Sequence, residues 1–472
     1  MACPACTAPV SADTGHTAKD DTVKHLPTPE EITRIRRDAL LNRAVEAYKF
    51  FYPSVSMLLN FEALDRYRAE ANRGFLIQLT TPDIVTLTQN SDTPYGLGYI
   101  DTSKAGPVVV EVPAGPVMGV VDDANFRFVT NMGIVGEEAG AGAKYLFVPP
   151  GHDGLLPDDG YVVKQLETNR ALVCIRVPDP DTQRGLDFLR TLRVYPLAEA
   201  DNPPANDFQD VSDRKLIADP VEIDATFGMW EAIKRALDTD VLTPTYYAQY
   251  GMLADLGIRR DRPFEPDDAL REVLTEAATK ANEQLVVAAF ADESADRLVW
   301  PDRRWEWVVY SEGDNGYYER DFLHLSVRER WFYQATLETP KMFMHREGAG
   351  SIYWLAGVDG AGDPLDGGTA YTLTVPTPVP ASQFWSITLY DLDTRSEINT
   401  PQFKPVLTSL RDDLTADSDG NIVLHFGPES PAEGKPWLQT NPGSQWFAYF
   451  RIYGPGTAAF DGTWKPTDFT KA

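Results

Sequence analysis

Hydrophobic positions along the chain follow two different periods, and this change predicts three regions. Short apolar runs separated by Gly, Pro, Asp and Asn fill residues 76–177 and return after Pro340. Such runs are typical of an antiparallel sandwich or barrel. Between them, apolar residues recur every three to four positions, as on one face of a helix. The order predicts a mainly β protein with a helical middle segment (α+β). The expected strands are Val108–Val112, Val117–Val121, Lys144–Val148, Ala171–Val177, Ala370–Val375, Phe384–Tyr390, Ile422–Phe426 and Trp446–Ile452.

Helix signals stand at both ends of the expected helical segments. Thr28 and Glu31 form a capping box before a helix that we expect to end near Pro53, because proline breaks a helix interior. A second helix is expected from Asp267 to about Phe290, since acidic residues suit a helix N-terminus. The other expected helices contain Leu186, Leu189 and Leu192, or Phe227, Trp230 and Ile233, or span Tyr318–Leu337.

These patterns divide the 472 residues into four parts. Residues 1–27 are rich in Ala, Thr, Pro and Ser and are predicted to be a disordered tail. That tail holds the CxxC of Cys3 and Cys6, which without a second pair is a weak metal signal. The predicted remainder is an N-terminal helix plus β domain (28–180), a helical connecting region (181–345) and a C-terminal β domain (346–472).

Charge limits the partners. The chain has 43 basic and 70 acidic residues, for a net charge of −27. Because a field of this sign repels phosphate backbones and anionic lipids, we expect no nucleic acid and no membrane surface as partner. The N-terminus lacks the basic and apolar segments of a signal peptide. We therefore expect a cytoplasmic protein, unless a secretion leader has been removed.

The sequence contains none of the common cofactor signatures. The six histidines form no HxH or HExxH, and there is no phosphate loop, no GxGxxG after a strand and no GxSxG elbow. We predict no metal and no cofactor, and we disfavour a serine hydrolase of the α/β type.

Candidate chemistry is concentrated in the stretch TLTQNSDTPYGLGYIDTS, directly before the apolar run PVVVEVP. A tight turn accounts for Asn90 and Asp92. A phenol or hydroxyl beside a partly buried carboxylate can instead donate or accept a proton. Both interpretations stay open. In the catalytic one, Asp92 is the general acid or base, Asn90 and Thr93 orient it, Tyr95 donates a proton, and Tyr99 helps to bind substrate.

Two arginines near the second β region could anchor an anion, because a guanidinium offers paired donors. Arg395 follows FWSITLYD in an acidic loop, where a surface ion pair is an equal alternative. Arg451 lies within WFAYFRIYGP, where an unpaired charge would be costly. It is predicted either to hold a buried carboxylate, such as Asp92 or Asp391, or to face a ligand cavity.

Adjacent carboxylates close another expected strand, in VVDDANFRF. Since neighbouring strand residues face opposite sides, we predict that one of Asp122 and Asp123 is exposed and the other pairs with Arg127. Cys174, in ALVCIRV, is expected to be a buried strand residue.

Two longer stretches resemble known families. QNSDTPYGLGYIDTSKAGPVVVEVP is similar to a bacterial and fungal domain of unknown function catalogued as family 1254, and LDGGTAYTLTVP, PASQFWSITLYD, EIN and RIYGP resemble its usual partner, family 1214. The resemblance covers roughly 31–177 and 348–466. It implies two jelly-roll-like antiparallel β domains joined by helices, and a homo-oligomer (dimer or tetramer). Where the family shows N-W-L-P, this chain has Pro436-Trp437-Leu438-Gln439, so no role carries over to that Asn.

We expect a cofactor-independent enzyme, a hydrolase, lyase or isomerase, that acts on a small organic molecule in or beside the N-terminal β domain. The alternatives are a jelly-roll protein that binds a ligand or carbohydrate on Trp385, Trp437 and Trp464, and an oligomeric scaffold without catalysis. An enclosed cavity near Asp92 would favour the enzyme, and an exposed aromatic strip the binding protein. The predicted substrate-binding residues are Arg451, Arg395, Tyr99, Trp385, Trp437 and Tyr453.

Overall fold

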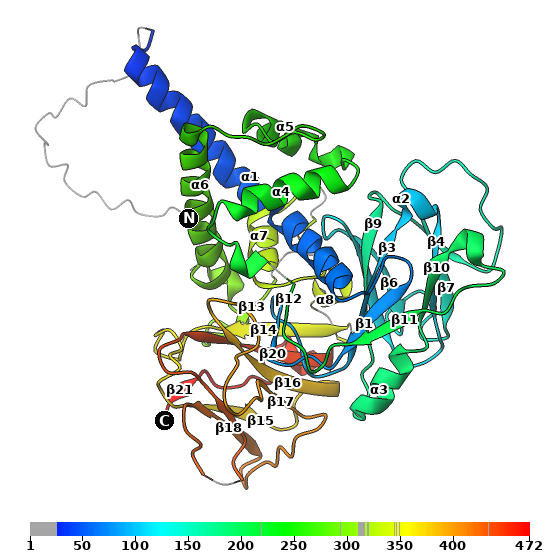
Figure 1. Cartoon of the computed structure of the whole chain (residues 1–472). Coiled ribbons are helices and arrows are strands. Elements are labelled where there is room, and N and C mark those ends of the chain that lie inside the picture. The colour runs from blue at the N-terminus through cyan, green and yellow to red at the C-terminus, as the bar shows by residue number, and fades with distance from the viewer. Residues whose placement is uncertain are drawn as a thin grey trace, which may run out of the picture.

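The computed structural model of the protein describes residues 26–218, 220–292, 294–309, 317–318, 321–343, 345, 347–348, 350–432 and 434–472. The predicted tail, with Cys3 and Cys6, lies outside these residues except for its last two positions. The described chain is mainly β with a helical middle segment, as the sequence predicts. Figure 1 shows two β units and a layer of helices that lies above the C-terminal unit and beside the N-terminal one.

The N-terminal β unit is a sandwich of two sheets. The larger sheet has the strand order β11-β1-β3-β9-β5-β6 and the smaller has β10-β4-β7-β8. Most pairs are antiparallel, but β1–β11 and β7–β8 are parallel. The core between the sheets is aliphatic and aromatic, as around Val110, Phe147 and Ile175. Its strands are β1 Gly74–Gln78, β3 Tyr95–Asp101, β4 Val108–Val112, β5 Met118–Asp123, β6 Phe128–Gly133, β7 Ala143–Val148, β8 Val162–Gln165, β9 Arg170–Arg176, β10 Arg193–Pro196 and β11 Asp207–Asp210; β2 Ile84–Val85 pairs separately with β12 Leu216–Ile217.

The C-terminal β unit is a second sandwich. Its sheets have the orders β13-β14-β20-β16-β17 and β19-β18-β15-β21. Trp354, Phe450 and Leu424 pack between them. The first strand of this unit comes from the connecting region, because β13 pairs with β14. The strands are β13 Glu306–Trp307, β14 Ser351–Ala356, β15 Tyr371–Pro376, β16 Ala381–Asp391, β17 Val406–Thr408, β18 Asn421–Gly427, β19 Trp437–Gln439, β20 Trp446–Pro455 and β21 Thr470–Lys471.

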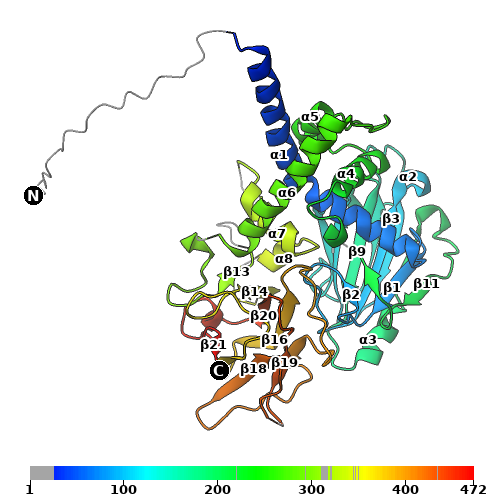
Figure 2. The same cartoon turned by 60° about the vertical axis from the view of Figure 1, so that its left-hand side comes forward.

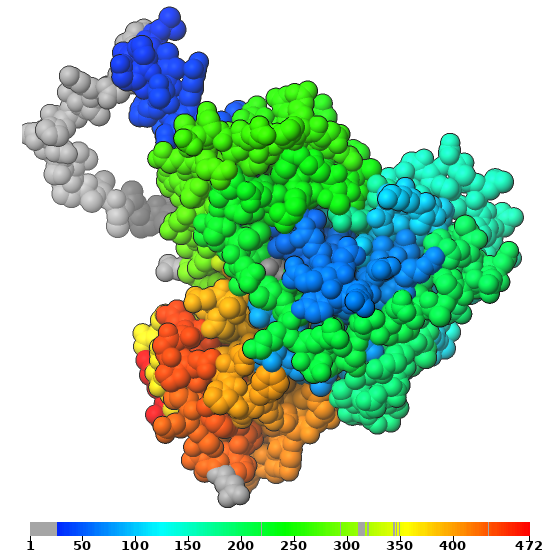
Figure 3. Space-filling model, in the orientation of Figure 1, coloured from blue at the N-terminus to red at the C-terminus, as the bar shows by residue number. Residues whose placement is uncertain are grey.

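The helical layer is built around the long helix α1, which packs against α4, α5, α6 and α7. Their shared core includes Tyr48, Trp230 and Leu274. Figure 2 shows α1 running from the layer to the N-terminal sandwich, and its first turns project from the surface in Figure 3. Among the described residues, no helix is long and apolar enough to cross a membrane. The helices are α1 Pro29–Arg66, α2 Thr102–Ala105, α3 Thr182–Leu189, α4 Gly228–Thr239, α5 Tyr247–Asp255, α6 Asp268–Phe290, α7 Leu325–Gln334 and α8 Pro340–Phe343.

The start of α1 follows the prediction, but its end does not. The Thr28 hydroxyl accepts from the Glu31 N–H, and the Glu31 carboxylate accepts from the Thr28 N–H. The helix continues through Pro53 to Arg66 instead of ending there. Proline removes one backbone donor, but Val55, Phe61 and the other apolar residues that follow are buried, and this packing offsets the loss.

The segment Tyr318–Leu337 is not one helix. Only Leu325–Gln334 is helical, and Tyr318 instead forms an isolated β-bridge with Leu323. Phe322, within the expected helix, is 61% exposed. The period-3.6 pattern here comes from the short helix α7, whose Trp331 and Phe332 are buried.

Candidate functional site

Side chains alternate along β3 and β9 between the core of the N-terminal sandwich and the outer face of its larger sheet. Ile175 and Val173 point into the sandwich core. Tyr95, Cys174 and Arg176 therefore lie on the opposite face, because successive strand residues alternate. The register pairs Tyr95 with Arg176 across the two strands. The outer face of the larger sheet thus carries a phenol beside a guanidinium.

The C-terminal sandwich presents a corresponding face. On β20, Phe450 and Ile452 belong to the core of that sandwich. Tyr449, Arg451 and Tyr453 alternate with them and face the other way. β14 contributes Tyr353 and β16 contributes Ser386, Thr388 and Tyr390 to the same face.

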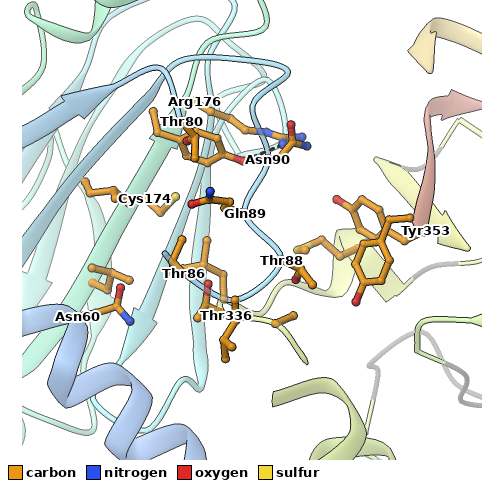
Figure 4. A pocket seen from close by; sticks show the side chains of 18 of the residues that line it. Asn60, Thr80, Thr86, Thr88, Gln89, Asn90, Cys174, Arg176, Thr336 and Tyr353 are labelled. Carbon is orange, nitrogen blue, oxygen red and sulfur yellow. Dashed lines mark hydrogen bonds between the residues drawn. The ribbon is translucent and has the colours of Figure 1, made fainter. Parts of the chain in front are cut away.

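The two faces enclose a cleft with two adjoining hollows. Figure 4 shows the first of them. The polar hollow, of about 120 Å³, is lined by Gln78, Thr80, Gln89, Asn90 and Arg451 among others. The apolar hollow, of about 110 Å³, is lined by Met118, Val120, Val135 and other side chains. Both hollows share Tyr95, Cys174, Arg176, Leu337, Met342 and Tyr353.

Two arginines in this cleft have no ion-pair partner among the described residues. Arg176 donates to the Tyr95 hydroxyl at 3.2 Å, and its guanidinium carbon lies 5.2 Å from the Tyr453 ring centre. Arg451 donates to the Thr388 hydroxyl at 2.9 Å and to the Tyr390 hydroxyl at 2.6 Å. Their hydrogen-bond partners are neutral, and the buried carboxyls of Asp92 and Glu397 interact with these charges without forming an ion pair. Both guanidiniums therefore remain available to an anion.

The rings of Tyr353, Tyr390 and Tyr449 surround Arg451, with centres 5.1 to 5.5 Å from its guanidinium carbon. Aromatic faces attract a desolvated cation, which lowers the cost of burying it. The sequence predicted a carboxylate partner or a ligand cavity for Arg451. The structure places Arg451 in the wall of a cavity.

The stretch with candidate chemistry forms the loop between the two sandwiches. The Asn90 amide donates to the Tyr453 hydroxyl at 2.6 Å, and its carbonyl oxygen accepts from the Asp92 N–H at 2.7 Å. The Ser386 hydroxyl donates to the Asp92 carboxylate at 2.7 Å. Arg411 donates to the backbone oxygen of Asp92 at 2.7 Å. The loop therefore binds the C-terminal sandwich through its own polar groups.

Asp92 is fully buried one layer behind the cleft wall. Its second carboxylate oxygen has no hydrogen-bond partner among the described residues. Burial raises the pKa of Asp92, opposed by the Ser386 hydrogen bond and the charge of Arg451. Thr93 is also fully buried and does not line the cleft. Asn90 and Tyr95 do line it.

Glu397, from the C-terminal unit, lies against the same loop. Its carboxylate accepts from the Ser91 N–H at 3.0 Å and from the Ser91 hydroxyl at 2.7 Å. Burial raises the pKa of Glu397 to about 8, against the opposing effects of these hydrogen bonds and of Arg451. This acidic group thus connects the two units in its protonated form at neutral pH.

Four predicted substrate-binding residues lie away from the cleft lining. Arg395 is buried in the helical layer, where it pairs with Asp224 and lies 4.1 Å from the Tyr333 ring centre. Trp385 packs on Phe450 inside the C-terminal core. The others are Tyr99, which donates to Asp65 at 2.6 Å, and Trp437, which donates to the backbone oxygen of Gly427 at 3.1 Å.

The aspartate pair in VVDDANFRF differs from the prediction, because both side chains are buried. Asp122 accepts from the Glu338 N–H at 2.7 Å. Asp123 accepts from the backbone N–H of Arg127 at 3.0 Å and lies 4.0 Å from its guanidinium. Backbone donors in the turn and in the neighbouring segment bind one oxygen of each carboxylate. The other oxygen of Asp122 has no hydrogen-bond partner among the described residues, and burial raises the pKa of Asp122 well above its usual range.

Sequence reasoning missed Arg176, Tyr353 and Tyr449. Arg176 had a detectable signal, because it is two positions from Cys174 in the same strand and must share its face. The tyrosines had none, since aromatic residues fill both faces of their strands. Cys174 is buried, as expected, and burial raises the pKa of its thiol to about 12. The described residues contain no group of three or more His, Cys, Asp or Glu that could hold a metal ion.

Two family models match the parts of the chain that form the two walls of this cleft. A model for proteins of unknown function, DUF1254, matches residues 75–194, and one for proteins of unknown function, DUF1214, matches residues 350–457. The chain contains both domains, in this order. The DUF1254 domain supplies Tyr95 and Arg176, and the DUF1214 domain supplies Tyr353 and Arg451. The resemblance inferred from the sequence motifs is thus confirmed.

The chain is similar to solved structures from two bacteria. The VPA0106 protein from Vibrio parahaemolyticus has a TM-score of 0.54 and 17% identity, with 92% of this chain and 100% of that chain covered. A putative uncharacterized protein from Burkholderia cenocepacia has a TM-score of 0.42 and 12% identity, with coverages of 93% and 96%. The first of these structures has the same overall fold over nearly the whole of this chain. No curated protein matches the chain.

Proposed function

We propose that the cleft binds a small organic anion and transforms it by acid–base chemistry, as a hydrolase, lyase or isomerase would. The observation that carries this proposal is the pair Arg176 and Arg451, which line one cleft without an ion-pair partner among the described residues. Burying two such charges is costly unless an anion compensates them. An anionic ligand removes that cost on binding.

Tyr95 is the proton donor in this proposal. Its oxygen accepts a hydrogen bond from Arg176, so its own O–H remains to donate into the cleft. Burial raises the pKa of Tyr95, opposed by Arg176, and keeps the phenol protonated at neutral pH. A developing negative charge on the substrate would be stabilised by the adjacent guanidinium.

Asp92 acts as a positioning residue in this scheme, because a fully buried carboxylate one layer back does not reach substrate. It orients Ser386, whose strand also carries Thr388, the partner of Arg451. Asn90 fixes Tyr453 in the apolar hollow.

Binding without catalysis is the second candidate, and one observation favours it. No Asp, Glu or His stands among the described residues that line either hollow, so a general base is missing from the cleft wall. The sugar-binding alternative has less support, since Trp385 and Trp464 are 5% and 7% exposed and offer no platform.

Thermal-shift measurements with small carboxylates, phosphates and their neutral amides test the proposal. We expect anions to raise the melting temperature of the wild type, since a ligand of the native state stabilises it. Arg176→Met and Arg451→Met should lose this shift, while Arg214→Met, an exposed arginine outside the cleft, keeps it. Equal shifts from neutral amides and anions would contradict the proposal.

Once a ligand is identified, Tyr95→Phe separates catalysis from binding. We expect turnover to fall about 100-fold or more, because a positioned acid contributes on that order, with little change in affinity. Asp92→Asn should reduce turnover less, since it acts through Ser386. Unchanged turnover in Tyr95→Phe would favour the binding candidate.

A further inference from the structure

The two hollows differ in chemistry, and Arg176 lies where they meet. Residues around the polar hollow include Gln78, Thr80, Thr86, Thr88, Gln89 and Asn90. In the apolar hollow, Met118, Val120, Val135, Leu337 and Met342 provide hydrocarbon surface. Figure 4 shows Arg176 and Cys174 on one side of the cavity, Tyr353 on the other, and the loop of Thr88 and Gln89 between them.

Polar groups of the apolar hollow are already paired with each other. Thr339 donates to the Asn131 carbonyl oxygen at 2.9 Å, and Ser351 donates to the Tyr353 hydroxyl at 2.7 Å. The Tyr453 hydroxyl accepts from Asn90. Each of these tyrosine oxygens accepts a hydrogen bond and keeps its own O–H, so the hollow offers a ligand a few phenol donors within a mainly apolar lining. Besides Arg176, the charged side chain among its described lining residues is Lys341.

The polar hollow differs in its open hydrogen-bonding groups, although apolar side chains such as Leu87 and Trp331 line it too. The side-chain carbonyl oxygens of Gln78 and Gln89 are buried without a donor among the described residues. Arg451 belongs to this hollow and not to the apolar one. A ligand that enters the cleft therefore meets unpaired acceptors and Arg451, set among apolar side chains such as Leu97 and Leu172, on one side of Arg176 and mainly hydrocarbon on the other.

We infer that the ligand is an organic carboxylate with a hydrocarbon arm: the carboxylate binds Arg176 at the junction, and the arm occupies the apolar hollow. This inference rests on the proposed function, because it assumes the anion site. The hollow, at about 110 Å³, approaches the roughly 150 Å³ of an engineered cavity that accepts benzene. An arm of a few carbons up to one ring is the size that fits.

Titration calorimetry of the full chain at fixed ionic strength, with acetate, butyrate, hexanoate, benzoate, phenylacetate and succinate, tests the inference. We expect affinity to rise about fourfold per added methylene until the hollow is full, since each buried methylene contributes a nearly constant amount. Met118→Gln, which changes the apolar hollow alone, should flatten this series without abolishing binding of acetate. Met252→Gln, a half-buried methionine outside the cleft, is the matched control and should keep the slope.

The outcomes separate this inference from the proposed function. If all carboxylates bind with equal affinity and Arg176→Met abolishes their binding, the anion site stands but the inferred hydrocarbon arm is wrong. Tighter binding of succinate than of butyrate would also overturn it, because the arm would then end in a second charge. No binding of any of these carboxylates would overturn the inference, while a thermal shift with phosphates that depends on Arg176 and Arg451 would leave the anion site standing. If Met118→Gln does not fold, Val120→Thr provides the same test at a neighbouring position of the hollow.

Discussion

At the scale of single residues, the buried arginines separate into two kinds. Arg395 has a carboxylate partner in Asp224 and contributes to the helical layer. Arg176 and Arg451 have neutral partners and line the cleft. All three occur in sequence contexts that look alike, an arginine among apolar or acidic residues. An arginine with a structural role is distinguished from one that can bind a ligand only by its partner, which is a carboxylate in the first case and a neutral group in the second.

Arg395→Met is expected to lower the free energy of unfolding by about 3 to 5 kcal/mol, because Asp224 is left as an unpaired charge with little solvent contact. Chemical denaturation measures this loss. The double variant with Asp224→Asn should recover part of it, since no uncompensated charge remains. Loss of ligand-induced stabilisation, beyond the loss of stability, would instead support the sequence-based role of Arg395 as an anion anchor.

At the scale of elements, the positions of the strands can be predicted from the local sequence with little knowledge of the tertiary structure. The predicted run Val108–Val112 is β4 itself, and Phe384–Tyr390 lies within β16. Alternation also assigns Trp385 to the core and Ser386 to the opposite face. Helix α1 is the counterexample, because its continuation past Pro53 depends on distant residues that cover its second half.

Strand β3 packs so closely in the N-terminal sandwich that Gly98 has no room for a side chain. A Cβ at Gly98 would lie 2.7 Å from the Phe75 ring and 2.9 Å from the Gly74 oxygen, so Gly98→Ala should cost about 1 to 3 kcal/mol in unfolding free energy. Gly251, within α5, has no heavy atom within 4 Å of such a Cβ. Gly251→Ala should therefore stabilise by about 0.5 to 1 kcal/mol. Denaturation midpoints of the two variants should move in opposite directions.

At the scale of the whole molecule, the loop from Thr88 to Thr93 joins the two sandwiches. Asn90 contacts Tyr453, Ser91 contacts Glu397 and Asp92 contacts Ser386, each across the junction. The cleft therefore exists only when both units are folded against each other. Ligand binding and the contact between the units should be coupled for this reason.

Stability of the junction should depend on pH through Glu397. Its pKa rises from 4.5 to about 8 on folding, so the folded protein holds a proton that the unfolded chain has lost in this window. The contribution of Glu397 to the free energy of unfolding should be fully present below about pH 4.5 and should decrease as the pH rises toward 8. Glu397→Gln should reduce this slope, by up to about 1.4 kcal/mol per pH unit.

Unfolding curves at several pH values measure the slope, with the exposed Glu429→Gln as control. Some decline should remain in Glu397→Gln, because burial raises the pKa of Glu338 to about 8 as well. An identical slope in wild type and Glu397→Gln would show that Glu397 does not hold its proton at the junction.

The sequence by itself determined the β–α–β order, most strand positions, the alternating faces and the stretch around Asn90 that lines the cleft. These depend on local period and turn chemistry, which neighbouring residues set. Tertiary structure alone decided which outward faces meet, and so it brought Arg176 and Arg451 into one cleft while it moved Arg395 and Trp385 out of reach. Residues more than 270 positions apart share that cleft, and no local pattern encodes such a distance because it arises from packing of two separately folded sandwiches.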